Sequence, residues 1–176
     1  MTWIKLKRSQ VDFHWHNMKK ISQILNQQIN VMHNRNWDRI YIAIDLHGTM
    51  MPSTYSNDEY GEYKLYKNAE EVLKWMSDCV NIRLILFTSS HPDSKADFIY
   101  NVYHRYGISF DYHNGNPEAQ NTDTGDFSEK FYYNVLLDDK AGFSPLEDWK
   151  DLLDNIPEFN RRFKNDGNNN SDEEDS

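Results

Sequence analysis

The feature that most constrains this sequence is a series of short apolar runs separated by helical patterns. The clearest runs cover residues 40–44, 82–87 and 133–137, and a weaker one covers 108–112. Near-continuous apolar runs are typical of strands that are covered on both faces, as in parallel sheets. Apolar residues at helical spacing lie between the runs. The resulting β–α alternation predicts an α/β fold, with a three-layer parallel sheet and helices on both faces.

Boundary residues support the helices. Pro92 suits the first turn of one helix and Gly107 its end, and Ser144-Pro145-Leu146-Glu147 resembles a capping box that opens another. We expect the following apolar residues on buried helix sides: Met18, Ile21, Leu25, Ile29, Met32, Val72, Leu73, Met76, Val80, Ala96, Ile99, Val102, Tyr103, Tyr106, Leu146, Trp149, Leu153 and Ile156.

Length and composition narrow the class of protein. A chain of 176 residues suits one domain with extensions, and we predict an N-terminal helical extension at 1–39, an α/β domain at 40–164 and a disordered acidic tail at 165–176. The net charge of -9 argues against a surface that coats DNA uniformly. Cys79 alone cannot form a disulfide framework or a cysteine-rich zinc site. With no long apolar segment and no secretory signal, we expect a soluble cytoplasmic protein without a membrane partner.

Residues 1–39 are locally basic, since seven Lys or Arg side chains face only two Asp side chains, an excess of +5. Trp3, Phe13, Trp15 and Trp37 are interspersed among them. Such a segment could bind a nucleic-acid strand by charge and stacking. The alternative is a docking helix whose charges are simply solvated, because the basic residues are spread out rather than clustered.

Chemically active residues follow the predicted strands. The first strand runs into Asp45-Leu46-His47-Gly48-Thr49, the second into Thr88-Ser89-Ser90, and the fourth into Asp138-Asp139-Lys140, with Lys130 shortly before it. In open parallel sheets, function gathers at the carboxyl ends of the strands. We therefore expect the acids to meet, and a separation of more than about 8 Å between Asp45 and both later acids would contradict a shared ion.

This set of residues indicates phosphoryl chemistry. Converging carboxylates repel one another unless a cation lies among them, and oxygen-only ligands favour a hard ion such as Mg²⁺. A carboxylate such as Asp45 can attack phosphorus and form an aspartyl-phosphate. Thr88 and backbone N–H groups can bind phosphate oxygens, Lys130 can neutralise charge, and Gly48 lets the backbone pass close to the phosphate.

On these motifs the chain resembles the haloacid-dehalogenase (HAD) superfamily of phosphohydrolases over roughly residues 40–145, and it is similar to HAD-like proteins of large bacteriophages. The resemblance rests on strand–Asp45-x-x-Gly48-Thr49, strand–Thr88, Lys130 and strand–Asp138-Asp139. It implies a Rossmann-like sheet of order 3-2-1-4. It also implies these site residues: Asp45 as nucleophile and metal ligand, the His47 carbonyl, Asp138 and Asp139 as further Mg²⁺ ligands, and Gly48, Thr49, Thr88, Ser89 and Lys130 at the phosphate.

His47 departs from the family pattern, in which this position usually carries a second Asp that acts as acid and base. Three interpretations stay open. Histidine can do acid–base work near neutral pH. Alternatively, the phospho-enzyme forms but turns over slowly, or the site binds metal or phosphate and catalyses little.

The two usual insertion points for a cap domain are short here, at residues 50–67 and 113–129, so the protein looks capless. An open site can accept a large phosphorylated substrate such as a nucleic-acid end or a phosphoprotein, unless a second copy of the chain or the N-terminal segment closes it. The leading hypothesis is a Mg²⁺-dependent phosphatase that acts through an aspartyl-phosphate on such a substrate, including nucleotides. The alternative is a weakly active or inactive HAD-fold binding or scaffolding protein.

Overall fold

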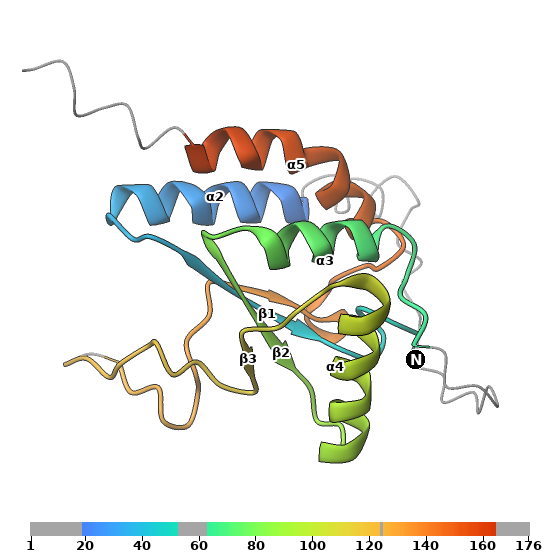
Figure 1. Ribbon diagram of the computed structural model, residues 1–176. Coiled ribbons are helices and arrows are strands. Elements are labelled where there is room, and N and C mark those ends of the chain that lie inside the picture. Colours follow the sequence, from blue (N-terminus) through green and yellow to red (C-terminus); the bar gives the residue numbers. More distant parts are fainter. Residues whose placement is uncertain (1–18, 53–62, 124, 165–176) are drawn as a thin grey trace, which may run out of the picture.

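The computed structural model describes residues 19–52, 63–123 and 125–164. Its centre is a parallel four-stranded sheet of order β3-β2-β1-β4 (Figure 1). The strands are β1 (Ile40–Asp45), β2 (Ile82–Phe87), β3 (Tyr112–His113) and β4 (Val135–Leu137). This arrangement confirms the predicted α/β class, the parallel sheet and the strand order.

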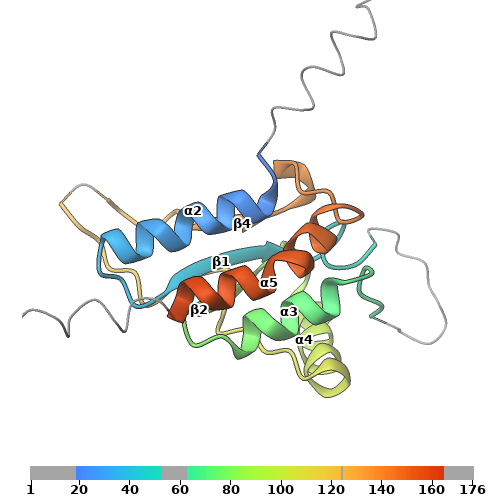
Figure 2. The ribbon, with the colours of Figure 1, turned by 90° about the horizontal axis from the view of Figure 1, so that it is seen from above.

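Four α-helices of the described residues pack on the sheet. They are α2 (Ile21–Asn34), α3 (Ala69–Asp78), α4 (Pro92–Tyr106) and α5 (Asp148–Lys164), and the 3₁₀ turn η1 (Asp139–Ala141) follows β4. In Figure 1, α2, α3 and α5 form a layer above the sheet and α4 lies lower, beside β2. Figure 2 shows α2 and α5 running side by side over β1. No helix of the described part is long and apolar enough to cross a membrane.

The main core lies between this helical layer and one face of the sheet. Ile42 and Ile44 of β1 and Leu84 of β2 are fully buried there, in one cluster with Leu25 of α2 and Trp149 of α5. Side chains alternate between the two faces of a strand, so every second residue of β1 and β2 contributes to this cluster. The core fixes the positions of the strand ends that carry the polar residues.

The opposite face of the sheet meets the segment between β3 and β4, whose described residues contain no helix. Glu118 of this segment accepts hydrogen bonds from the Tyr41 hydroxyl (2.8 Å) and from Arg83 Nε (3.3 Å). The Phe131 ring packs edge-on against Phe87, with 5.6 Å between ring centroids. A polar and aromatic loop therefore covers this part of the second face.

α2 is part of the same core although it lies within the segment that the sequence assigns to an N-terminal extension. Ile21, Leu25, Ile29 and Met32 are buried, as the helical spacing predicts. The predictions for the basic and aromatic residues 1–18 and for the acidic tail 165–176 lie outside the described residues. Any truncation meant to test the basic segment should therefore stop before α2.

Outside α4, two residues expected on buried helix sides are exposed. Leu146 is 82% exposed and Val80 is 79% exposed. Residues 145–147 form a turn and α5 begins only at Asp148, so Leu146 precedes the amphipathic stripe. Asp148 Oδ2 accepts a hydrogen bond from the Ser144 backbone N–H (2.7 Å), which is the role that the capping-box pattern gives to Glu147.

The boundaries predicted for α4 are confirmed, since Pro92 lies in its first turn and Gly107 ends it in a left-handed conformation. The predicted buried side is partly wrong. Ala96 and Tyr103 are exposed, and Phe98 is buried instead. The helix thus lies on the core along a line through Phe98 and Val102, because the bulky Phe98 ring buries more apolar surface than Ala96 would.

Candidate metal centre

Three acids converge at the carboxyl edge of the sheet. Asp45 ends β1, and because Ile44 of β1 pairs with Leu137 of β4, Asp138 and Asp139 emerge beside it. Each acid offers a carboxylate oxygen, and these oxygens lie within 4.8 Å of one another. The separation is well below the limit of about 8 Å set from the sequence. Asp45 and Asp138 are half-buried and Asp139 is exposed, so the group opens toward solvent.

The electrostatics of the cluster favour a cation. Burial raises the pKa of Asp45, the Leu46 backbone N–H opposes this, and the negative charge of Asp138 raises the pKa further. Ionising Asp45 beside the other two acids therefore costs free energy. A divalent ion among them would remove that cost.

Gly48 makes the close approach of Asp139 possible. A Cβ atom at position 48 would lie 2.7 Å from Asp139 Oδ2 and 2.9 Å from its Cγ. The Gly48 φ angle is also +87°, in the left-handed region that favours glycine. The sequence attributes this glycine to close passage of a phosphate, and the structure adds a second reason, which is room for the Asp139 carboxylate.

Thr49 ties the loop after β1 to the loop after β4. It is fully buried, and its Oγ1 accepts a hydrogen bond from the Asp139 backbone N–H (2.9 Å). Its carbonyl accepts from Trp149 Nε1 (2.9 Å), which is itself fully buried in α5. The position of Asp139 is thereby set by contacts that reach into the core. The predicted contact of Thr49 with phosphate stays a prediction.

Asp138 caps the short turn η1. Its Oδ1 accepts a hydrogen bond from the Lys140 backbone N–H (2.8 Å), and its carbonyl accepts from Phe143 N (3.0 Å). Lys140 Nζ lies 3.9 Å from Asp139 Oδ1, and its charge lowers the pKa of Asp45. Lys140 is a cation near the acids to which the sequence assigned no role, although its position directly after Asp139 could have signalled one.

His47 joins the end of β1 to the end of β2. Its Nδ1 lies 3.4 Å from Ser90 Oγ, which lies 2.9 Å from Thr88 Oγ1. Asn114 holds Thr88 in place on both sides, because its Oδ1 accepts from Thr88 N (2.8 Å) and its Nδ2 donates to Thr88 O (2.7 Å). Ser90 and Asn114 are thus positioning residues to which the sequence gave no defined role.

Two of the predicted site residues have no described contact that brings them to the acids. Lys130 is exposed in the segment before β4, and Ser89 is exposed after Thr88. Their roles at a phosphate stay predictions, as does the role of the His47 carbonyl as a ligand.

The donor set suits a hard divalent cation. The available side-chain donors are carboxylate oxygens, which Mg²⁺ prefers, and Mg²⁺ is commonly held by few carboxylates with water and phosphate completing its shell. The space that Gly48 leaves beside Asp139 keeps that carboxylate within reach of the other two. The residues therefore fit a metal ion of this class.

No protein-family model, curated protein or solved structure matches this chain in comparisons with known proteins.

Proposed function

We propose that the chain is a Mg²⁺-dependent phosphohydrolase that acts through an aspartyl-phosphate, as the resemblance of its motifs to the capless HAD phosphatases implies. The observation that carries the proposal is the convergence of Asp45, Asp138 and Asp139, whose carboxylate oxygens lie within 4.8 Å of one another at the carboxyl edge of the sheet. A bound divalent ion would supply the positive charge that lets a phosphate dianion approach these acids.

Asp45 is the proposed nucleophile. One oxygen of its carboxylate attacks phosphorus, an Asp45–O–P bond forms, and the bond between phosphorus and the leaving oxygen breaks with the electron pair going to that oxygen. Water then attacks the same phosphorus, the Asp45–O–P bond breaks, and inorganic phosphate and the free carboxylate are released. Asp138 and Asp139 act as ligands of the ion.

His47 is the proposed acid and base. In the first step its protonated ring donates a proton to the leaving oxygen, and in the second step the neutral ring accepts a proton from the attacking water. Its position two residues after Asp45 and the nearby Ser90 hydroxyl, 3.4 Å from Nδ1, support this role, since a hydrogen bond at one nitrogen orients the other.

The remaining residues would bind the phosphoryl group. The Thr88 hydroxyl, Ser89 and the backbone around Gly48 and Thr49 are the proposed hydrogen-bonding groups, and Lys130 is the proposed cation. Thr88 is supported best, because it is buried at the end of β2, next to β1, and fixed there by Asn114.

The test is release of phosphate from an aryl phosphate with and without Mg²⁺. The wild type should hydrolyse it only with Mg²⁺, Asp45→Asn should lose turnover, and the exposed Asp123→Asn should match the wild type. Asp45→Asn removes the nucleophile while keeping the shape of the side chain, so we expect a loss of at least about 100-fold.

The His47→Asp variant distinguishes a phosphatase from a protein that binds metal or phosphate without catalysis. The proposal is supported if the wild type is active and the His47→Asp variant has equal or lower activity. An inert wild type whose His47→Asp variant gains Mg²⁺-dependent turnover would instead identify a binding protein that has kept the pocket and lost catalysis.

A further inference from the structure

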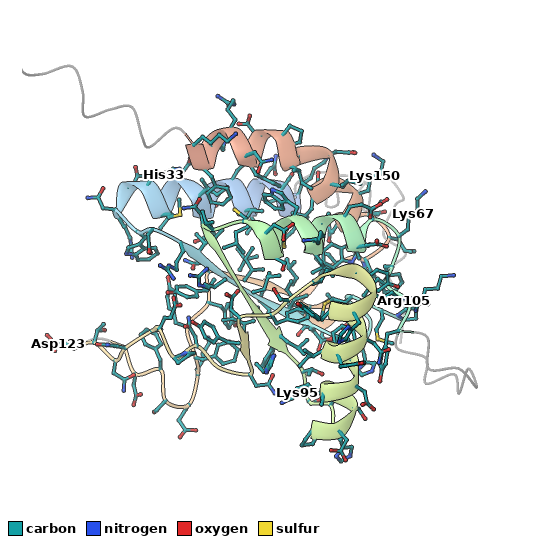
Figure 3. All side chains as sticks on the ribbon, viewed as in Figure 1. His33, Lys67, Lys95, Arg105, Asp123 and Lys150 are labelled. Atoms are coloured by element: carbon teal, nitrogen blue, oxygen red, sulfur yellow. The ribbon has the colours of Figure 1, made fainter. Side chains whose placement is uncertain are left out.

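A cavity lies at the opposite end of β1 from the acids. This cavity of about 430 Å³ is lined by Trp37 and Arg39, which precede the strand, by Tyr41 within it, and by Phe127 and Tyr132 of the segment between β3 and β4. Tyr41 and Asp45 are four residues apart on one face of the strand, which is about 13 Å. In Figure 3 the segment between β3 and β4 extends to Asp123, on the same side of the molecule as His33 near the end of α2. Lys150 lies on the other side. The cavity is therefore separate from the candidate metal centre.

The aromatic side chains of the cavity are arranged around one ring. Tyr132 makes edge-to-face contacts with Trp37, Tyr41 and Phe127, with ring centroids 6.3, 6.0 and 5.5 Å apart. All four rings are only half-buried. An aromatic cluster that stays open to solvent beside a cavity of this size can receive a planar ring.

Polar contacts hold these rings in position. The Tyr132 hydroxyl accepts from Asn134 Nδ2 (3.0 Å), and its carbonyl accepts from Nδ2 of the buried Asn116 (2.9 Å). The Tyr41 hydroxyl donates to Glu118 Oε2 (2.8 Å). Because the rings are fixed before any ligand arrives, binding would not have to order them.

One cation beside the rings, Arg35, is available to an anion, although the acid Asp38 also lines the cavity. Arg39 is already paired with Asp38 and Glu118. Arg35 is exposed, its guanidinium lies 5.1 Å from the centre of the Trp37 ring, and no carboxylate among the described residues pairs with it. A cation next to an aromatic platform matches a ligand that carries a planar ring and a negative charge.

We propose that this cavity binds a nucleotide unit, with the base against the rings of Trp37 and Tyr132 and the phosphate near Arg35. The nucleotide is either free or part of a single strand, since base stacking and an arginine serve both. This inference does not rest on the proposed phosphatase activity, because it concerns the other end of the sheet and its test measures binding.

The experiment titrates the full chain in EDTA, so that no metal ion loads the acids. Calorimetry measures binding of AMP, dTMP and ribose 5-phosphate, and fluorescence anisotropy measures binding of a labelled ten-nucleotide oligo-dT at low salt. Trp37→Ala should weaken nucleotide binding about tenfold through lost stacking. Arg35→Ala should weaken it and reduce its dependence on salt.

Lys150→Ala is the matched control, because it also removes one exposed positive charge but lies far from the cavity. It should bind like the wild type. Circular dichroism and thermal melting check each variant, and Arg35→Ala decides the matter if Trp37→Ala does not fold, since Arg35 is exposed.

Nucleotide binding that falls in Arg35→Ala and not in Lys150→Ala supports the proposal. Tighter binding of the oligonucleotide than of the mononucleotides then identifies a strand as the source, and the reverse identifies a free nucleotide. The proposal is overturned if neither probe binds at millimolar concentration, if ribose 5-phosphate binds as tightly as AMP, or if Lys150→Ala weakens binding as much as Arg35→Ala. Aryl phosphate hydrolysis should persist in Arg35→Ala, so failure of one proposal leaves the other standing.

Discussion

The Asp139 carboxylate lies against the open side of Gly48, at 2.7 Å from the point where a Cβ would stand. The loop after β1 and the loop after β4, about ninety residues apart in the chain, therefore pack closely because residue 48 has no side chain. Thr49 continues the same contact by accepting the Asp139 backbone N–H. These contacts hold Asp139 beside the loop that follows Asp45.

Gly48→Ala should cost more stability than glycine-to-alanine substitution at a second left-handed position. At Gly142 φ is +101°, but no atom lies within 4 Å of an added Cβ. Gly142→Ala should cost about 1–2 kcal/mol from backbone strain alone. Gly48→Ala should cost about 0.5–1.5 kcal/mol more, because the Asp139 carboxylate must also turn away from the added Cβ. Urea unfolding of both variants measures the difference, and equal losses would contradict the role given to Asp139.

Thr49→Val should leave the Asp139 backbone N–H without its acceptor. The substitution keeps the shape of the side chain and removes only the hydroxyl, so the free energy of unfolding should fall by about 1–3 kcal/mol. Thr49→Ser retains the hydroxyl and serves as the control. If Thr49→Ser loses as much stability as Thr49→Val, packing of the methyl group matters more than the hydrogen bond.

Mg²⁺ should stabilise the wild type against unfolding. A ligand that binds only the folded state adds about 2.7 kcal/mol at a hundred times its dissociation constant. Asp139→Asn should lose most of this Mg²⁺-dependent gain, and Asp123→Asn, which removes an exposed acid elsewhere, should keep it. Thermal melting with EDTA and with increasing Mg²⁺ measures the effect. Equal gains in all three proteins would indicate nonspecific binding to an acidic surface.

Strands β1, β2 and β4 and the convergence of acids could be predicted because they follow from local pattern and topology. The third strand was expected at 108–112, and β3 lies at Tyr112–His113. Apolar runs ended by Asp45 and by Asp138-Asp139 predict parallel strands, and the resemblance to the HAD superfamily implies that these two strands are adjacent. Their shared edge brings the acids together. The helix faces were predicted less well. Leu146 and Tyr103 fit a helical stripe in the sequence, but the start of α5 and the rotation of α4 depend on packing partners elsewhere in the chain.

The cavity at the other end of β1 could not be predicted in the same way. Tyr41 and Tyr132 come from segments about ninety residues apart, and the part of the chain that carries Tyr132 has neither strand nor helix periodicity. The sequence singled out Trp37 as one of several aromatic residues in a basic segment, but only the fold shows which rings join it. The conformation of an irregular loop depends on long-range contacts such as those of Glu118, and a local sequence pattern does not predict such contacts.

Glu118 should make stability depend on pH in the acidic range. The pKa of Glu118 is lowered from its ordinary value of 4.5, mainly by the hydrogen bond from the Tyr112 hydroxyl. Tyr41, Arg83 and Arg39 lower the pKa further, and partial burial opposes them. A lowered folded-state pKa means that the ionised carboxylate stabilises the protein fully above about pH 4.5, and that this stabilisation is lost as the pH falls through the lower value. Glu118→Gln should therefore be about 1 kcal/mol less stable than the wild type at pH 7, and the gap should shrink toward pH 3. Denaturant unfolding across this range measures the gap, with the exposed Glu129→Gln as the control. A gap that is constant with pH would show that Glu118 acts through packing rather than charge.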